Sequence, residues 1–203
     1  MGAKIKYIIM CAGKGTRWSD YLGVPKHLIT INGETLLGRT TRLLKQFGVT
    51  DYIITTRQPE LYQPYGTCVP QQYNDCEIDR FDEKYVDGPV CYLYGDVYYT
   101  EEALKAIIET PVKDIMFFGH EMEIFAIKIK DLDLFFSHKK RVKKLYMAHK
   151  INRCIGWEVY RSLHKIPWDQ HVITYRYTYI LDGTDDIDYP HEYEAFKERL
   201  EKK

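Results

Sequence analysis

The chain has 203 residues and a mass of 24.1 kDa, a length that favours a single domain with one core, residues 1–203. Hydrophobic residues make up 45% and charged residues 29% of the sequence, a balance that excludes disordered, collagen-like and coiled-coil classes. Lysine and arginine together number 29, as do aspartate and glutamate, so no overall field attracts nucleic acid or an anionic membrane.

The first elements form a βαβ unit. Residues 4–10 are a nearly continuous β-branched and aromatic run, which predicts a strand buried on both faces. Residues 35–47 place leucines on one helical stripe, and Gly48 follows where a helix commonly ends. A short strand is predicted at 51–55. This order indicates an α/β sheet with parallel strands.

The remaining elements continue the alternation of strands and helices. The stretch 58–89 is polar and contains several prolines, and we expect it to be mostly irregular with one short helix. The patterns beyond it predict strands at 90–94, 114–118, 123–130 and 172–180, and helices at 100–108, 132–146, 152–163 and 190–200. There is no internal repeat.

Neither export nor membrane insertion is indicated near the N-terminus. The longest apolar stretch there, 7–12, is far shorter than the roughly 20 residues of a membrane span and too short for a signal peptide. The cysteines are odd in number and lack C-x-x-C spacing, which favours reduced thiols that serve in packing. They are Cys11, Cys68, Cys76, Cys91 and Cys154. We therefore expect a cytoplasmic protein.

A glycine-rich turn with nearby cations follows the first strand. Gly13 and Gly15 allow backbone N–H groups to approach an anion at the carboxyl end of that strand. The spacing fits neither the dinucleotide fingerprint nor the Walker P-loop. Lys14, Arg17 and Lys26 surround the turn, and three cations beside a glycine loop suit a triphosphate. A glycine turn with incidental surface cations is the alternative.

These residues resemble the nucleotidyltransferase superfamily, which includes nucleoside-diphosphate-sugar pyrophosphorylases, cytidylyltransferases and molybdenum-cofactor guanylyltransferases. The shared signature is A-x-G-x-G-[ST]-R after a strand, matched by 11–17 with Cys11 in place of the usual second small residue, and then P-K-x-L, matched by 25–28. The resemblance implies a single-domain three-layer α/β/α sandwich with a mostly parallel mixed sheet, of the Rossmann-like nucleotide-diphospho-sugar transferase fold. The nucleotide-binding half would span about 1–110, and the acceptor-binding half about 111–203.

The resemblance also implies a magnesium ion, with Mn²⁺ as an alternative, held by two distant carboxylates. The first is Asp96, which directly follows a predicted buried strand and so faces the crevice of the glycine loop. The second is Asp188, or alternatively Asp186, in an acidic segment before Pro190. The other interpretations are a turn at Asp96 and a favourable charge at a helix start at Asp188.

The expected function is transfer of a nucleoside monophosphate from a triphosphate to a phosphorylated small acceptor, with release of pyrophosphate. Arg17, Lys26 and Asp96 are the predicted catalytic residues. Predicted nucleotide contacts are Ala12, Gly13, Lys14, Gly15, Thr16, Arg17, Lys26 and, by analogy with relatives that read the base with a glutamine, Gln72. A glycosyltransferase of related fold and a non-catalytic nucleotide-binding module are the rival hypotheses.

The sequence leaves the base and the acceptor open. Cytidine, uridine and guanosine all stay candidates, as do a sugar phosphate, a phospho-polyol, phosphocholine and a phosphonate. The wall of the acceptor site is expected within 120–180, including Glu123, Lys128, the basic run 138–144 and Arg176. For the basic run itself, a solvated helix face is the first interpretation and an acceptor phosphate the second. Neither nucleic acid nor a membrane is an expected partner, and the oligomeric state is open.

Overall fold

The computed structural model describes residues 4–19 and 21–201. The strands are β1 (Lys6–Cys11), β2 (Thr30–Ile31), β3 (Glu34–Thr35), β4 (Tyr52–Thr56), β5 (Cys68–Pro70), β6 (Val90–Tyr94), β7 (Val97–Tyr98), β8 (Ile115–Gly119), β9 (Ile124–Ile129), β10 (Tyr177–Tyr179) and β11 (Asp185–Asp186). The α-helices are α1 (Leu36–Gln46), α2 (Pro59–Tyr62), α3 (Glu101–Glu109), α4 (Leu132–Met147), α5 (Gly156–His164) and α6 (Pro190–Glu201). The 3₁₀ turns include η2 (Lys26–Leu28), η4 (Glu77–Arg80) and η5 (Glu83–Tyr85).

A seven-stranded mixed sheet, ordered β10-β8-β9-β6-β1-β4-β5, forms the centre of the molecule. β6, β1, β4 and β5 run parallel to one another, and β9 is antiparallel to both of its neighbours. The carboxyl ends of β1, β4 and β6 therefore meet at one edge of the sheet. In such sheets this edge is where ligands bind.

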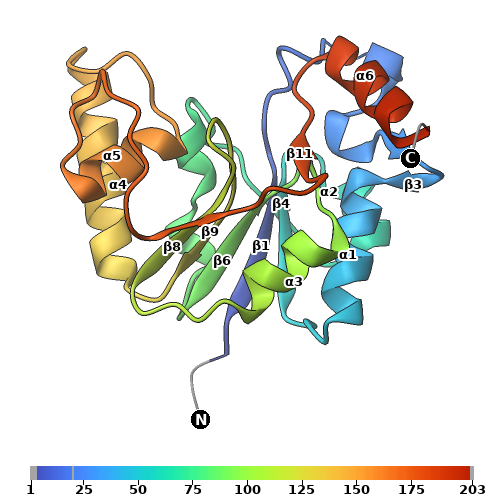
Figure 1. The fold of residues 1–203 in the computed structure, drawn as a ribbon, viewed down its shortest axis with the longest axis horizontal. Helices are drawn as coiled ribbons and strands as arrows, with labels where there is room; N and C mark the ends of the chain where they lie inside the picture. Colours follow the sequence, from blue (N-terminus) through green and yellow to red (C-terminus); the bar gives the residue numbers. More distant parts are fainter. Residues whose placement is uncertain (1–3, 20, 202–203) are drawn as a thin grey trace.

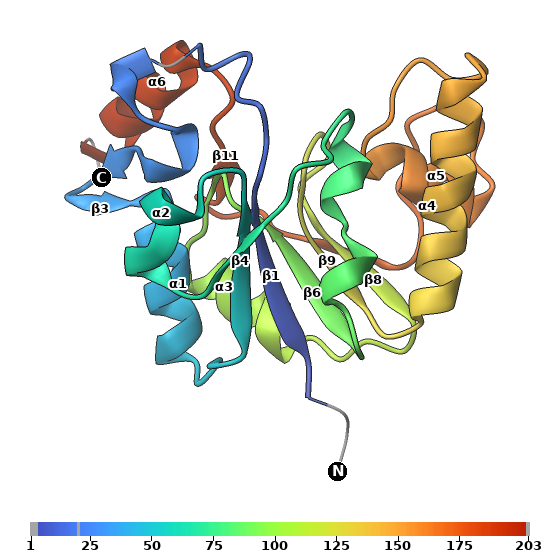
Figure 2. The ribbon, with the colours of Figure 1, turned by 180° about the vertical axis from the view of Figure 1, so that it is seen from behind.

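Helical layers cover both faces of the sheet, as the predicted sandwich requires. α1 and α3 lie over the face seen in Figure 1, whereas the segment with η4 and η5 lies across β6 on the opposite face (Figure 2). α4 joins the η4–η5 side, where Phe135 meets Phe81 edge to face with ring centroids 5.5 Å apart. Apolar side chains of the central strands are sealed between these layers, as shown by Ile8, Ile9 and Leu93, which are fully buried.

The C-terminal segment crosses the molecule to reach the N-terminal half. After β10 the chain passes over the face of the sheet seen in Figure 1 and pairs β11 antiparallel with β7. α6 then packs against the segment that follows β1. This contact is a second, smaller apolar cluster made of Trp18, Ile29, Ile31, Leu36, Tyr98, Ile187, Tyr193 and Phe196.

Two stretches differ from the sequence prediction. Residues 58–89 are more ordered than expected, because β5 pairs with β4 at the edge of the sheet and several short helical turns follow. Conversely, the strand predicted at 172–180 is confined to β10 at 177–179. Thr174 there bonds through its backbone N–H to the Tyr160 hydroxyl, 2.7 Å away, instead of to a strand, so tertiary contact overrides the alternating pattern. In the part of the chain that the structure describes, no helix is long and apolar enough to cross a membrane.

Candidate active site

The turn after β1 exposes backbone amides at the carboxyl end of the sheet. Gly15 has a φ of +61°, a conformation that side-chain-bearing residues rarely adopt. Its carbonyl accepts from the N–H of Trp18 at 3.0 Å, which closes the turn. A Cβ on Gly13 would contact the guanidinium of Arg80 at 3.4 Å, so this glycine allows a cation to approach the loop closely.

This turn forms one side of a cleft with a volume of about 310 Å³. The opposite side comes from residues far along the chain, which places both halves of the sequence around one space. The lining residues are 13–18, Lys26, 74–77, Arg80, Tyr94, Asp96, Val97, Glu123, Ile124, Ile155, Trp157, Asp186 and Asp188. This cleft is the candidate active site.

Lys26 connects the two predicted carboxylates. Its Nζ lies 2.5 Å from Oδ2 of Asp96 and 2.6 Å from Oδ1 of Asp188. All three side chains are largely buried, with 9–13% of their side-chain surface exposed. Arg17 pairs with the other oxygen of Asp188. Residues far apart in the sequence thus converge on one buried ammonium group.

The small β7–β11 sheet is what brings the carboxylates together. Asp96 follows β6 and precedes β7, so it stands at the carboxyl edge of the main sheet. β11 pairs Asp186 with Val97, and the N–H of Ile187 donates to the carbonyl of Asp96 at 3.1 Å. Ile187 is fully buried in the second apolar cluster, and because side chains alternate along an extended chain, Asp186 and Asp188 face the cleft.

The buried ion pairs determine the charge state of Asp96. Burial alone would raise the pKa of its carboxyl group, but the nearby cation of Lys26 outweighs burial and holds that pKa well below its usual range. Asp96 is therefore an anion at neutral pH. A buried carboxylate that keeps its charge is a ligand for a cation.

Glu123 and Asp186 also line the cleft, where burial and neighbouring carboxylates act on both of them. Burial, together with the charge of Asp188, raises the pKa of Glu123 to about 7. Burial and the charge of Glu123 raise the pKa of Asp186 to about 8. This wall of the cleft is therefore rich in carboxyl groups, and a ligand that donates hydrogen bonds to them would stabilise them.

The structure brings most of the predicted nucleotide contacts to the cleft, but two lie elsewhere. Residues 13–17 and Lys26 line it, with Lys14 exposed and its Nζ 3.8 Å from a carboxylate oxygen of Asp75. Ala12 is buried below the turn and accepts a hydrogen bond through its carbonyl from the side chain of Asn74. Gln72 is exposed and is not among the residues that line the cleft. Its neighbour Gln71 is buried, and its Nε2 donates to the carbonyl of Asp79 at 2.9 Å.

Sequence reasoning missed Arg80, Asn74 and Trp157, which all line the cleft. Arg80 adds a cation beside Gly13, and its Nε lies 3.4 Å from the side-chain oxygen of Asn74. Arg80 and Asn74 belong to the stretch 58–89, where no hydrophobic periodicity indicated an ordered structure. Trp157 lies at the start of α5, and its place in the sequence pattern is that of an ordinary buried aromatic residue. No sequence signal separated these residues from packing residues.

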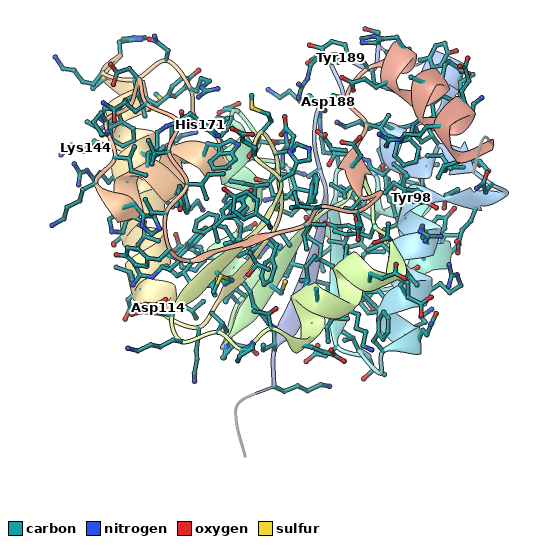
Figure 3. All side chains as sticks on the ribbon, viewed as in Figure 1. Tyr98, Asp114, Lys144, His171, Asp188 and Tyr189 are labelled. Atoms are coloured by element: carbon teal, nitrogen blue, oxygen red, sulfur yellow. The ribbon has the colours of Figure 1, made fainter. Side chains whose placement is uncertain are left out.

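Several residues expected on the acceptor wall have structural roles instead. Lys128 is buried in β9, and its ammonium donates to the carbonyls of Ile107, Ile108 and Thr110 at 2.8–2.9 Å, at the end of α3. Arg176 pairs with Asp114, which lies at the far end of the sheet from Asp188 (Figure 3). Of the expected wall, Glu123 does line the cleft.

The basic run 138–144 mostly faces the η4–η5 segment. Lys143 lies 2.8 Å from Asp79, and Lys140 lies 3.2 Å from Glu83. Lys139 donates to the carbonyl of Phe81. Several of these cations are thus committed to neighbouring groups, and none of them is among the residues that line the cleft.

The convergence of Asp96 and Asp188 suits a divalent cation. Two carboxylate oxygens already meet around one positive nitrogen, and Mg²⁺ is bound by one or two protein carboxylates together with phosphate oxygens and water. Within the described residues no cluster of three or more acidic, histidine or cysteine ligands holds a metal by itself. The donor set therefore fits an ion that arrives with a phosphate.

Comparison with known proteins finds a family match over part of the chain. Residues 7–90 match the family described as the MobA-like NTP transferase domain. A search of curated proteins found no match.

Solved nucleotidyltransferase structures share the whole fold. The inositol-1-phosphate CTP transferase from T. maritima aligns with a TM-score of 0.64 at 14% identity, over 98% of this chain and 97% of that chain. The CTP:phosphocholine cytidylyltransferase from Streptococcus pneumoniae aligns with a TM-score of 0.63 at 16% identity, over 98% and 100%. The 4-diphosphocytidyl-2C-methyl-D-erythritol synthase from Anaerococcus prevotii aligns with a TM-score of 0.64 at 14% identity, over 99% of this chain and 100% of that chain. The predicted resemblance to the nucleotidyltransferase superfamily is confirmed, and the chain has its fold.

Proposed function

We propose that the protein is a nucleotidyltransferase that transfers a nucleoside monophosphate from a triphosphate to a phosphorylated small acceptor and releases pyrophosphate. The observation that carries the proposal is the meeting of Lys26, Asp96 and Asp188 opposite the glycine turn, in one cleft. A phosphate oxygen of the acceptor attacks the α-phosphorus, and pyrophosphate leaves from the opposite side. Catalysis of this kind depends on positioning and on neutralising charge.

The residues of the turn bind the triphosphate. The backbone amides around Gly13 and Gly15 donate to phosphate oxygens, as amides in such turns do. Lys14 and Arg17 are exposed at the mouth of the cleft, where they stabilise the charge that builds up on the leaving pyrophosphate. Arg80, next to Gly13, adds a third cation to this side.

Lys26 exchanges partners when the nucleotide binds. Without substrate its ammonium forms ion pairs with both aspartates. With substrate it would contact the α-phosphate, and Asp96 and Asp188 are the residues that would hold Mg²⁺ or Mn²⁺. When bound, the ion supplies positive charge to the phosphate oxygens. The low pKa of Asp96 keeps this ligand ionised at neutral pH.

The acceptor lies against the wall with Glu123, Asp186 and Trp157. Carboxyl groups accept hydrogen bonds from hydroxyl or ammonium groups, and an aromatic ring packs against an apolar or cationic surface. The wall therefore suits an acceptor with hydrogen-bond donors beside its phosphate, such as a phospho-polyol, a sugar phosphate or phosphocholine.

A pyrophosphate-release screen tests the proposal. The purified protein, with Mg²⁺, is given each of the four common ribonucleoside triphosphates against a panel of phosphorylated acceptors. We expect pyrophosphate from at least one pair and none when either substrate is left out. Asp96→Asn, with the side chain nearly unchanged in shape, is the matched inactive control.

The rival functions give different results in the same screen. A glycosyltransferase of related fold releases a nucleoside diphosphate from a nucleotide sugar and no pyrophosphate. A non-catalytic binding module binds nucleotide without turnover and without dependence on Mg²⁺. Either outcome would overturn the proposal.

A further inference from the structure

Two cysteines face each other at the wall of the cleft, and the proposed reaction uses neither of them. Cys76 and Cys154 are 78 positions apart in the sequence, yet their Sγ atoms are 2.7 Å apart. Both are free thiols. Because a disulfide bond is about 2.05 Å long, a movement of less than about 1 Å would join them.

The two thiols differ in access and in their charged neighbours. Cys76 is half-buried and lines the cleft, whereas Cys154 is only 3% exposed. The ammonium of Lys143 lies 3.2 Å from Sγ of Cys76, and Asp79 holds Lys143 in place at 2.8 Å. A nearby ammonium stabilises a thiolate, which is the reactive form of cysteine.

The pKa values of the two thiols are shifted in opposite directions, in agreement with this difference in surroundings. The hydrogen bond between Cys76 and Cys154 and the Lys143 ammonium, acting against burial and the Asp79 carboxylate, lower the pKa of the Cys76 thiol. The interaction with Cys76 and burial raise the pKa of Cys154. Cys76 is thus the nucleophile of the pair, and Cys154 is the partner that reacts second.

We propose that Cys76 and Cys154 form an oxidation site for hydrogen peroxide, with Cys76 as the reacting thiol and Cys154 as the resolving thiol. The Cys76 thiolate attacks a peroxide oxygen, so an S–O bond forms and the O–O bond breaks. The leaving oxygen takes up a proton as water, and Cys76 becomes a sulfenic acid. Cys154 then loses its proton and attacks the Cys76 sulfur. The S–S bond forms, the S–O bond breaks, and the hydroxide leaves as a second water.

The disulfide would fix two segments of the cleft wall to each other. Cys76 precedes η4, whose Glu77 and Arg80 line the cleft, and Cys154 precedes α5, whose Trp157 lines it. These segments already meet through hydrogen bonds from the N–H of Ile78 to the carbonyl of Cys154, 3.3 Å, and from the N–H of Gly156 to Glu77, 2.9 Å. Oxidation therefore stabilises an arrangement that is already present, and the site does not depend on the proposed transferase activity.

Titration of the reduced protein with hydrogen peroxide, followed by thiol blocking and peptide mass spectrometry, tests the site. We expect a peptide pair linked between Cys76 and Cys154, two hydrogens lighter than the reduced pair, before Cys11, Cys68 or Cys91 reacts. A thiol reductant should reverse the link. The oxidised protein should also melt at a higher temperature, because the bond closes a long loop in the unfolded chain.

Variants separate the roles of the two thiols and the lysine. Cys154→Ser should stop at a sulfenic acid on Cys76, which a dimedone probe traps, and should form no link. Lys143→Met should slow the reaction of Cys76 several-fold, whereas Lys144→Met, an exposed position on the same helix that points away from the sheet, should not (Figure 3). No Cys76–Cys154 link at peroxide levels that oxidise the other cysteines would overturn the proposal. So would an unchanged rate in a folded Lys143→Met variant.

Discussion

Lys26, with its buried ammonium group, is the residue on which the site depends most. Its ammonium pairs with two carboxylates that would otherwise repel each other in a poorly solvated space. The motif around Pro25 predicted its importance from the sequence, but the motif gave no indication that the lysine would bridge Asp96 and Asp188. The distance between those aspartates in the chain hides the contact, because only the folded sheet brings them together.

Replacing Lys26 should lower turnover strongly. We expect Lys26→Gln to reduce the rate of pyrophosphate release about 10²- to 10³-fold, the usual effect of losing one preorganised charge contact. Steady-state kinetics of the variant measure this, with circular dichroism to check folding. Lys4→Gln, on an exposed lysine outside the cleft, is the matched control and should keep full activity. Equal activity in a folded Lys26→Gln variant would exclude Lys26 from the reaction.

His27, next to Lys26, makes stability depend on pH. The ring is 4% exposed, and burial lowers its pKa from 6.5 to about 4. Above pH 6.5 the ring is neutral in both the folded and the unfolded chain. Between pH 6.5 and 4 only the unfolded chain takes up the proton, so the free energy of unfolding should fall as the pH falls, by on the order of 3 kcal/mol in total.

Urea denaturation at a series of pH values measures this effect. In His27→Asn the part of the decline that belongs to this ring should disappear. His149→Asn, at an exposed position, should leave the pH dependence of the free energy of unfolding as it is in the wild type. An identical decline in wild type and His27→Asn would show that His27 does not contribute.

At the scale of elements, the short β7–β11 sheet assembles the carboxylate pair. Each strand has only two residues, too short for an alternating pattern to reveal, and no sequence prediction included them. Ile187, fully buried between Asp186 and Asp188, fixes their orientation. The aspartates therefore depend on an apolar anchor.

Shortening this anchor should affect both stability and activity. Ile187→Ala should reduce the free energy of unfolding by about 2–5 kcal/mol because it leaves a cavity, whereas Ile187→Val should cost about 0.5–1.5 kcal/mol. Chemical denaturation measures the difference. Pyrophosphate release at a temperature where both variants are folded should be lower in Ile187→Ala. If the two variants unfold alike and are equally active, the anchor role is wrong.

The end of α3 is held by the side chain of Lys128, a residue that the sequence analysis expected on the wall of the acceptor site. The Lys128 ammonium donates to three carbonyls there. Removing it leaves buried acceptors unpaired, and we expect Lys128→Met to cost about 1–3 kcal/mol of unfolding free energy. The KM for the acceptor should not change, since Lys128 does not line the cleft. Lys130→Met, on the exposed neighbouring lysine, is the control. A raised acceptor KM with unchanged stability would restore Lys128 to the acceptor site.

At the scale of the whole molecule, the alternation of strongly patterned strands and helices predicted an α/β sheet with parallel strands, and the family resemblance implied the three-layer α/β/α sandwich. The glycine turn and Pro25–Leu28 also carried enough local signal to indicate the resemblance to the nucleotidyltransferase superfamily. Residues such as Arg80 and Trp157 could not be predicted, because they reach the cleft through tertiary packing of irregular or ordinary core segments. The acceptor wall is of this kind, so the acceptor is the least predictable part of the function.

The fate of each phosphate of the triphosphate is the sharpest test of attack at the α-phosphorus. With the nucleotide and acceptor found by the screen, the triphosphate is labelled either at the α- or at the γ-phosphorus. Attack at the α-phosphorus requires that the α-label appear in the acceptor product and the γ-label in pyrophosphate, in equal amounts. Appearance of the γ-label in the acceptor product or in inorganic phosphate would contradict the account.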